Sequence, residues 1–85
     1  MRKTSSWKLE ATYAGMPHGK DHLLLDVNGG VRRDHAWINA LHGNWPDGIP
    51  VGSRVSFFAS PHYRHGECKL TDIREVRMIR SAEKW

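Results

Sequence analysis

The chain has 85 residues, which leaves room for one domain with a small core. Apolar residues make up 39% and charged residues 26%, a balance typical of globular proteins and not of disordered ones. The 13 Lys and Arg residues outnumber the 9 Asp and Glu residues, and the resulting net charge of +4 favours an anionic partner. The lone cysteine, Cys68, excludes an internal disulfide.

The N-terminal segment is basic, but no hydrophobic stretch of the kind found in a secretory signal follows it. No apolar run approaches the roughly 18 residues of a membrane helix. We therefore expect a cytoplasmic protein. Residues 1–85 are expected to form one domain, with loosely held ends at 1–5 and 81–85.

Short apolar runs separated by Gly, Pro and Asn predict a small all-β domain. Each run alternates apolar and polar residues with a period of two, as in a half-buried strand. The alternation predicts five strands, in chain order at residues 7–13, 22–27, 31–39, 54–60 and, as two successive runs, 67–71 and 74–79. Between the second and third strands, Asn28-Gly29 is expected to form a tight hairpin turn.

The same alternation predicts which side chains face the interior. The inward-facing residues are expected to be Leu9, Leu23, Leu25, Ile38, Val55, Phe57 and Val76. Trp7 starts the apolar face of the first strand and is expected in the core. Trp45 lies among Gly and Pro residues and is expected to cap one end of the sheet.

The longest connection lies between the third and fourth strands, at residues 40–50. Its Gly and Pro residues allow one helical turn at most. Five strands with the longest connection after the third match the five-stranded Greek-key barrel of the OB-fold, with the helix of that connection reduced or absent. An SH3-like barrel is the alternative, because it also has five short strands.

Three segments carry a family resemblance: D-H-A-W-I-N at 34–39, V-G-S-R-V-S-F-F-A at 51–59 and K-L-T-D at 69–72. They resemble segments of small, single-domain OB-fold-like proteins of phages and mobile elements, over roughly residues 5–79. The compact turn at 28–30 and the Gly- and Pro-rich stretch 43–50 depart from that pattern. The resemblance implies an OB-fold. It also implies action by stoichiometric binding, for example docking on a host or element-encoded protein.

No group of residues predicts catalysis. Cys68 would need a neighbour that lowers its thiol pKa to act as a nucleophile, and the sequence supplies none. His62, His65 and Cys68 follow one another at metal-ligand spacing, as do His18 and His22, but they do not make the two ligand pairs usual in a structural zinc site. We expect no enzymatic activity, no metal site and no cofactor.

Basic and aromatic residues fall on the segments that form the binding face of an OB-fold, namely the second and third strands and the loops beside them. There, aromatic rings stack on bases and basic side chains contact phosphates. The residues predicted to bind single-stranded DNA or RNA in this way are Lys20, Arg32, Arg33, Trp37, Tyr63 and Arg64. Lys69 adds a further basic residue. Trp37 fits either a stacking platform or packing beneath a loop, so a protein-interaction module is the alternative function.

Overall fold

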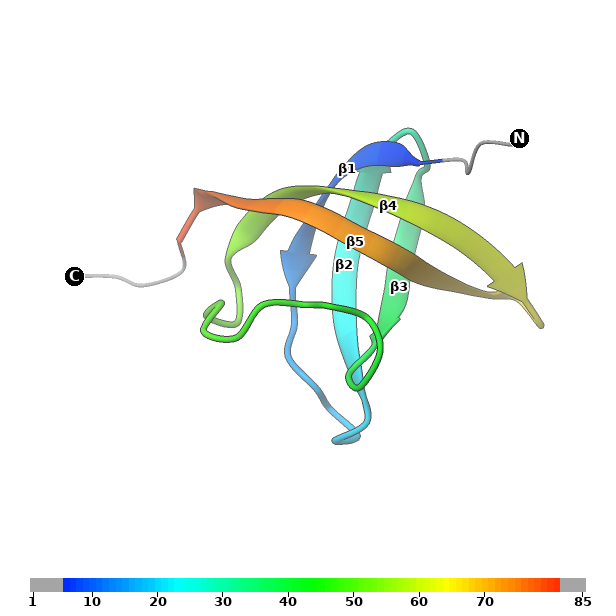
Figure 1. Cartoon of the computed structure of the whole chain (residues 1–85), viewed down its shortest axis with the longest axis horizontal. Helices are drawn as coiled ribbons and strands as arrows, with labels where there is room; N and C mark the ends of the chain where they lie inside the picture. The colour runs from blue at the N-terminus through cyan, green and yellow to red at the C-terminus, as the bar shows by residue number, and fades with distance from the viewer. Residues whose placement is uncertain (1–5, 82–85) are drawn as a thin grey trace.

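The computed structural model describes residues 6–81, and five β-strands account for most of them (Figure 1). The strands are β1 (Trp7–Tyr13), β2 (Asp21–Gly29), β3 (Arg33–Asn39), β4 (Arg54–Arg64) and β5 (Glu67–Arg80). The predicted loose ends, 1–5 and 81–85, lie outside the described residues apart from Ser81, which follows β5. No helix within residues 6–81 is long and apolar enough to cross a membrane.

The strands close into a barrel in the order β1-β2-β3-β5-β4, and β1 pairs with β4 to complete the ring. All neighbouring strands are antiparallel except β3 and β5, which meet in parallel at Trp37 and Lys69. This connectivity is that of the five-stranded OB-fold, so the predicted fold class is confirmed. The parallel contact separates it from the SH3-like alternative.

The connection between β3 and β4 contains turns and no helix, as its Gly and Pro residues predict. It begins with a tight turn in which the Asn39 Oδ1 atom accepts hydrogen bonds from the backbone N–H groups of Leu41 and His42, at 2.9 and 2.8 Å. Gly43 closes the turn, because a side chain there would collide with the Ile38 side chain and the Asn39 carbonyl.

One apolar cluster fills the barrel. Its buried members are Leu9, Ala11, Tyr13, Leu24, Val27, Ala36, Ile38, Trp45, Val55, Phe57, Ala59, Cys68, Leu70 and Ile73. The prediction is confirmed for Leu9, Ile38, Val55 and Phe57, which are fully buried. Val76 is partly buried and packs against the cluster.

The predicted orientation of β2 is wrong. Leu24 is fully buried, whereas Leu23 is half-buried and Leu25 is 39% exposed. The cause is a β-bulge in β2. Glu10 and Thr12 of β1 are two residues apart, but their partners on β2, Asn28 and Leu25, are three residues apart, so β2 has one extra residue. Within this bulge Asp26 adopts a φ of 50°. Leu24 and Val27 therefore face the interior together although they are three residues apart.

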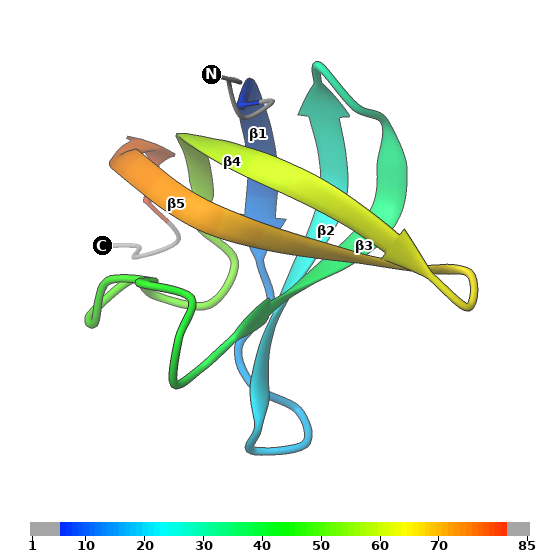
Figure 2. The ribbon, with the colours of Figure 1, turned by 45° about the vertical axis from the view of Figure 1, so that its right-hand side comes forward.

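Three further expectations need correction. Trp7 is 45% exposed, and its indole lies against Gly30 at the turn after β2. Asn28-Gly29 end strand β2 instead of forming the turn. The last two predicted runs are one continuous strand, β5, in which Asp72 and Glu75 have positive φ where the register against β4 shifts. These irregularities let a long strand curve around the barrel (Figure 2).

Candidate nucleic-acid interface

The outer face of β3 presents two aromatic rings beside two leucines. Ala36 and Ile38 point into the core, so His35 and Trp37 point outward. Their antiparallel partners on β2 are Leu25 and Leu23, respectively, which share the outer face. The bulge in β2 therefore adds apolar side chains to this surface.

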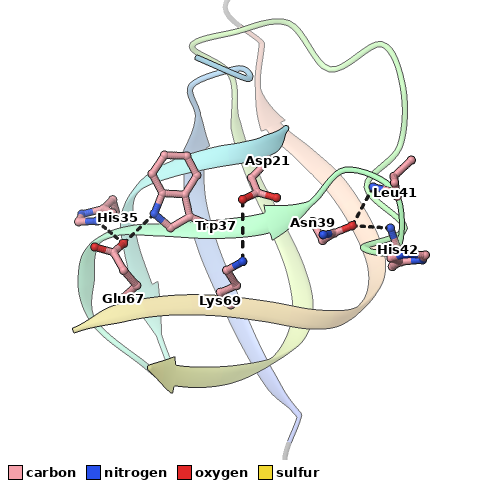
Figure 3. A network of polar contacts seen from close by, with 8 residues as sticks. All are labelled: Asp21, His35, Trp37, Asn39, Leu41, His42, Glu67 and Lys69. Carbon is pink, nitrogen blue, oxygen red and sulfur yellow. Dashed lines mark hydrogen bonds and ion pairs between the residues drawn. The ribbon is translucent and has the colours of Figure 1, made fainter. Parts of the chain in front are cut away.

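Glu67, the first residue of β5, accepts a hydrogen bond from the indole of Trp37. The Trp37 Nε1–H donates a hydrogen bond of 2.8 Å to Glu67 Oε1, and the His35 Nε2 atom lies 3.2 Å from the same oxygen (Figure 3). These two hydrogen bonds, that of Trp37 above all, lower the pKa of the Glu67 carboxyl group. Glu67 therefore stays ionised at neutral pH and holds the indole in place. The Trp37 side chain itself remains half-buried.

Trp37 lines a groove of about 710 Å³ between the β1–β2 loop, β3 and β5. The remaining lining residues are His18, Lys20, Asp21, Glu67 and Lys69. The Lys69 Nζ atom lies 3.9 Å from Asp21 Oδ2 (Figure 3). The His18 ring lies across from Trp37, with centroids 6.1 Å apart and ring planes inclined by 31°. This groove combines aromatic surface with two ammonium groups.

A second groove, of about 800 Å³, lies farther along β3 toward the β2–β3 turn. Arg32, Arg33 and His35 line it, together with Gly66 of the β4–β5 hairpin. The Arg33 guanidinium lies 5.0 Å from the centre of the Tyr63 ring, and its Nη2 donates to the Gly66 carbonyl at 3.3 Å. A planar cation held over an aromatic ring can contact a phosphate or stack on a base.

Four of the six predicted binding residues line the two grooves. Lys20 and Trp37 line the first groove, and Arg32 and Arg33 line the second. Tyr63 joins them through its contact with Arg33. Arg64 lies exposed near the hairpin tip and lines neither groove.

Sequence reasoning did not assign His18, His35 or Glu67 to this surface. His35 could have been found, because it lies two residues before Trp37 on the same strand face. Glu67 is 30 positions from Trp37 in the sequence and reaches it because β3 and β5 pair in parallel. No local pattern in the sequence signals that contact.

The residues at metal-ligand spacing do not converge. The His62 Nε2 atom is 3.0 Å from Thr71 Oγ1, and Cys68 is buried in the core. Burial raises the pKa of the Cys68 thiol. Within residues 6–81, no three His, Cys, Asp or Glu side chains gather in a way that could hold a metal ion.

Comparison of the chain with protein-family models, curated proteins and solved structures finds no match. The relationship to phage and mobile-element proteins therefore stays a prediction. What the chain offers toward a function is the geometry of its two grooves, with aromatic rings and basic side chains on one face of the barrel.

Proposed function

We propose that this protein binds single-stranded nucleic acid along the outer face of β3, without catalysing a reaction. The observation that carries the proposal is the setting of Trp37, whose half-buried ring lines a groove with Lys20 and Lys69. Single strands are bound by this combination, because bases stack on aromatic rings while cations follow the phosphates.

The second groove extends the same surface. His35 lines the second groove and Trp37 the first, and both bind the same oxygen of Glu67. Two successive grooves suit a chain of nucleotides better than one compact ligand. Arg32 and Arg33 then provide the phosphate contacts beyond the Trp37 groove.

Acidic side chains equal the basic ones in number in the lining of each groove. Asp21 and Glu67 line the first groove, and Asp26 and Asp34 line the second. Binding should therefore be moderate in strength and sensitive to salt. With about three phosphates neutralised, the log–log dependence of affinity on salt should have a slope near −2, at about −0.7 per contact.

The test is fluorescence anisotropy of labelled single-stranded DNA and RNA oligonucleotides at several salt concentrations. Trp37→Ala should weaken binding by about 1–3 kcal/mol, or roughly 5- to 150-fold, with an unchanged salt slope, because stacking carries no charge. Arg33→Ala should flatten the slope by about 0.7. Trp7→Ala is the matched control, since Trp7 is exposed but lines neither groove.

Absence of binding to any oligonucleotide at low salt contradicts the proposal, and so does an equal effect of the Trp7 and Trp37 substitutions. A protein-docking role is then the second candidate. It is favoured by Leu25, which is 39% exposed beside His35 and serves neither base stacking nor phosphate contact. Aromatic and Arg residues next to an apolar side chain are also the usual anchors of protein interfaces.

A further inference from the structure

His18 and Trp37 face the same groove from different elements. His18 belongs to the β1–β2 loop, and Trp37 to β3. Their ring centroids are 6.1 Å apart. Because stacked bases repeat at about 3.4 Å, a base between two other rings needs about 7 Å between them. The centroid separation is therefore within about 1 Å of the spacing that would hold a base, and the ring planes, now inclined by 31°, would become more nearly parallel when a base is inserted.

The two sides of this pair differ in how firmly they are held. Trp37 is fixed by its hydrogen bond to Glu67 and by its place in the sheet. His18 is exposed, and the following Gly19 has a φ of 71° with open space around it. A backbone hydrogen bond of 3.1 Å, from Gly19 N–H to the Met16 carbonyl, closes the tip of this loop, and one of 2.8 Å, from Leu23 N–H to the Gly15 carbonyl, closes its base. The exposed His18 side of the groove is therefore less constrained by neighbouring atoms than the Trp37 side.

Glu67 lies at the edge of the same groove with one carboxylate oxygen available. Its Oε1 atom accepts from Trp37 and lies near His35, while Oε2 has no hydrogen bond or ion pair with residues 6–81. An ionised carboxylate accepts hydrogen bonds and donates none. It therefore favours a base edge that carries N–H groups and disfavours one dominated by carbonyl oxygens.

On the basis of the proposed function, we infer that His18 and Trp37 clamp one nucleobase of a bound strand, and that Glu67 makes this site favour guanine over thymine or uracil. Guanine presents two adjacent donors, N1–H and the N2 amino group. Thymine and uracil present one N–H between two carbonyl oxygens, which a carboxylate repels. Lys20 and Lys69, which line the same groove, are positioned to contact the phosphate of that nucleotide.

The experiment compares a labelled dT12 oligonucleotide with the same strand carrying one central guanine. The unmodified protein should bind the guanine strand about fivefold or more tightly, which corresponds to the lower end of base discrimination by a side chain. Glu67→Gln should bring the two affinities close together. A Gln carbonyl still accepts from the Trp37 N–H, so the platform keeps its position. Glu75→Gln is the matched control, because it removes the same charge from an exposed position on β5 outside both grooves.

The clamp itself is tested at His18. His18→Ala should weaken binding of the guanine strand about fivefold or more through loss of one stacking face, and His18→Phe should restore it. Binding of both strands with equal affinity overturns the inference and leaves the proposed function standing. Binding of neither strand overturns the proposed function itself. If free GMP competes at concentrations similar to those of the oligonucleotide, a single nucleotide is enough to occupy the site. That result would support the base clamp and contradict a strand as its ligand.

Discussion

Trp45 and Trp37 lie at different places on the barrel and have opposite surroundings. Trp45 is 8% exposed, and its ring centroid lies 5.5 Å from that of Tyr13, 6.0 Å from His22 and 5.6 Å from Phe57. Its Nε1–H has no hydrogen-bond partner among the described residues. Trp37 has the reverse arrangement, with its N–H bonded to Glu67 and part of its ring open to the groove.

The surroundings of Trp45 and Trp37 have different energetic consequences. At Trp45, burial of the large ring outweighs the cost of an unpaired N–H, which is about 1–3 kcal/mol. At Trp37, a polar contact orients the ring without covering it, which costs apolar burial but leaves a surface on which a ligand can stack. The number of tryptophans in a small protein therefore says little about function, whereas the partner of each indole N–H and the cover over each ring say much.

The largest effect should come from removing the buried ring. Trp45→Ala should reduce the free energy of unfolding by about 3–5 kcal/mol, because it leaves a large cavity among Tyr13, His22 and Phe57. Trp37→Ala should reduce it by about 1 kcal/mol or less, as expected near the surface. Urea denaturation followed by circular dichroism measures both.

If Trp45→Ala does not fold, Trp45→Phe provides the same comparison. It keeps most of the ring and removes the unpaired N–H, so it should be far less destabilising than the alanine variant. Equal losses from Trp37→Ala and Trp45→Ala would show that the two rings are equally part of the core, and would remove the structural contrast on which the Trp37 platform is based.

The same inner and outer contrast separates two neighbouring leucines. Leu24→Ala should cost about 2–5 kcal/mol of stability, because Leu24 is fully buried. Leu25→Ala should cost less than about 1 kcal/mol, since Leu25 is 39% exposed on the outer face beside His35. Thermal or urea unfolding of the two variants distinguishes them directly. The reverse order of the two losses would contradict the bulge at Asp26.

This pair also shows where sequence reasoning succeeds and where it stops. Alternation correctly identified Ile38, Val55 and Phe57 as core residues, because β3 and β4 keep a regular period there. It failed in β2, since the extra residue at Asp26 shifts the inward face and a positive φ at Asp has no strong sequence signature. The order of the strands and the missing helix followed from the turn residues and the length of the third connection.

The binding surface was predictable to a similar extent. Lys20 and Trp37 were assigned from their positions in the expected fold, and the structure brings them into one groove. Glu67 and His18 were not, because each meets Trp37 from a segment that is distant in the sequence. Contacts between distant segments depend on how the strands close, and the period of a single strand carries no information about that closure.

The smallest expected effect is a dependence of stability on pH at the Trp45 end of the barrel. The Tyr13 hydroxyl and His22 Nδ1 lie 2.7 Å apart, and the His22 ring packs beside Trp45. Burial lowers the pKa of His22 below its ordinary value of 6.5, against the opposing influence of Asp21 and Asp47. Burial also raises the pKa of Tyr13, which favours its hydroxyl as the donor to a neutral imidazole.

A lowered histidine pKa means that the unfolded chain binds the proton more readily than the folded one. The contribution of His22 to stability should therefore be complete above about pH 6.5 and should decline as the pH falls below it. Melting temperatures measured from pH 8 to pH 5 should show this decline, and His22→Gln should reduce it. His65→Gln, at the exposed hairpin tip, controls for the loss of one imidazole. Because the pKa of Glu67 is lowered, its hold on Trp37 should persist over this range, so acid should weaken the buried end of the barrel before it alters the groove.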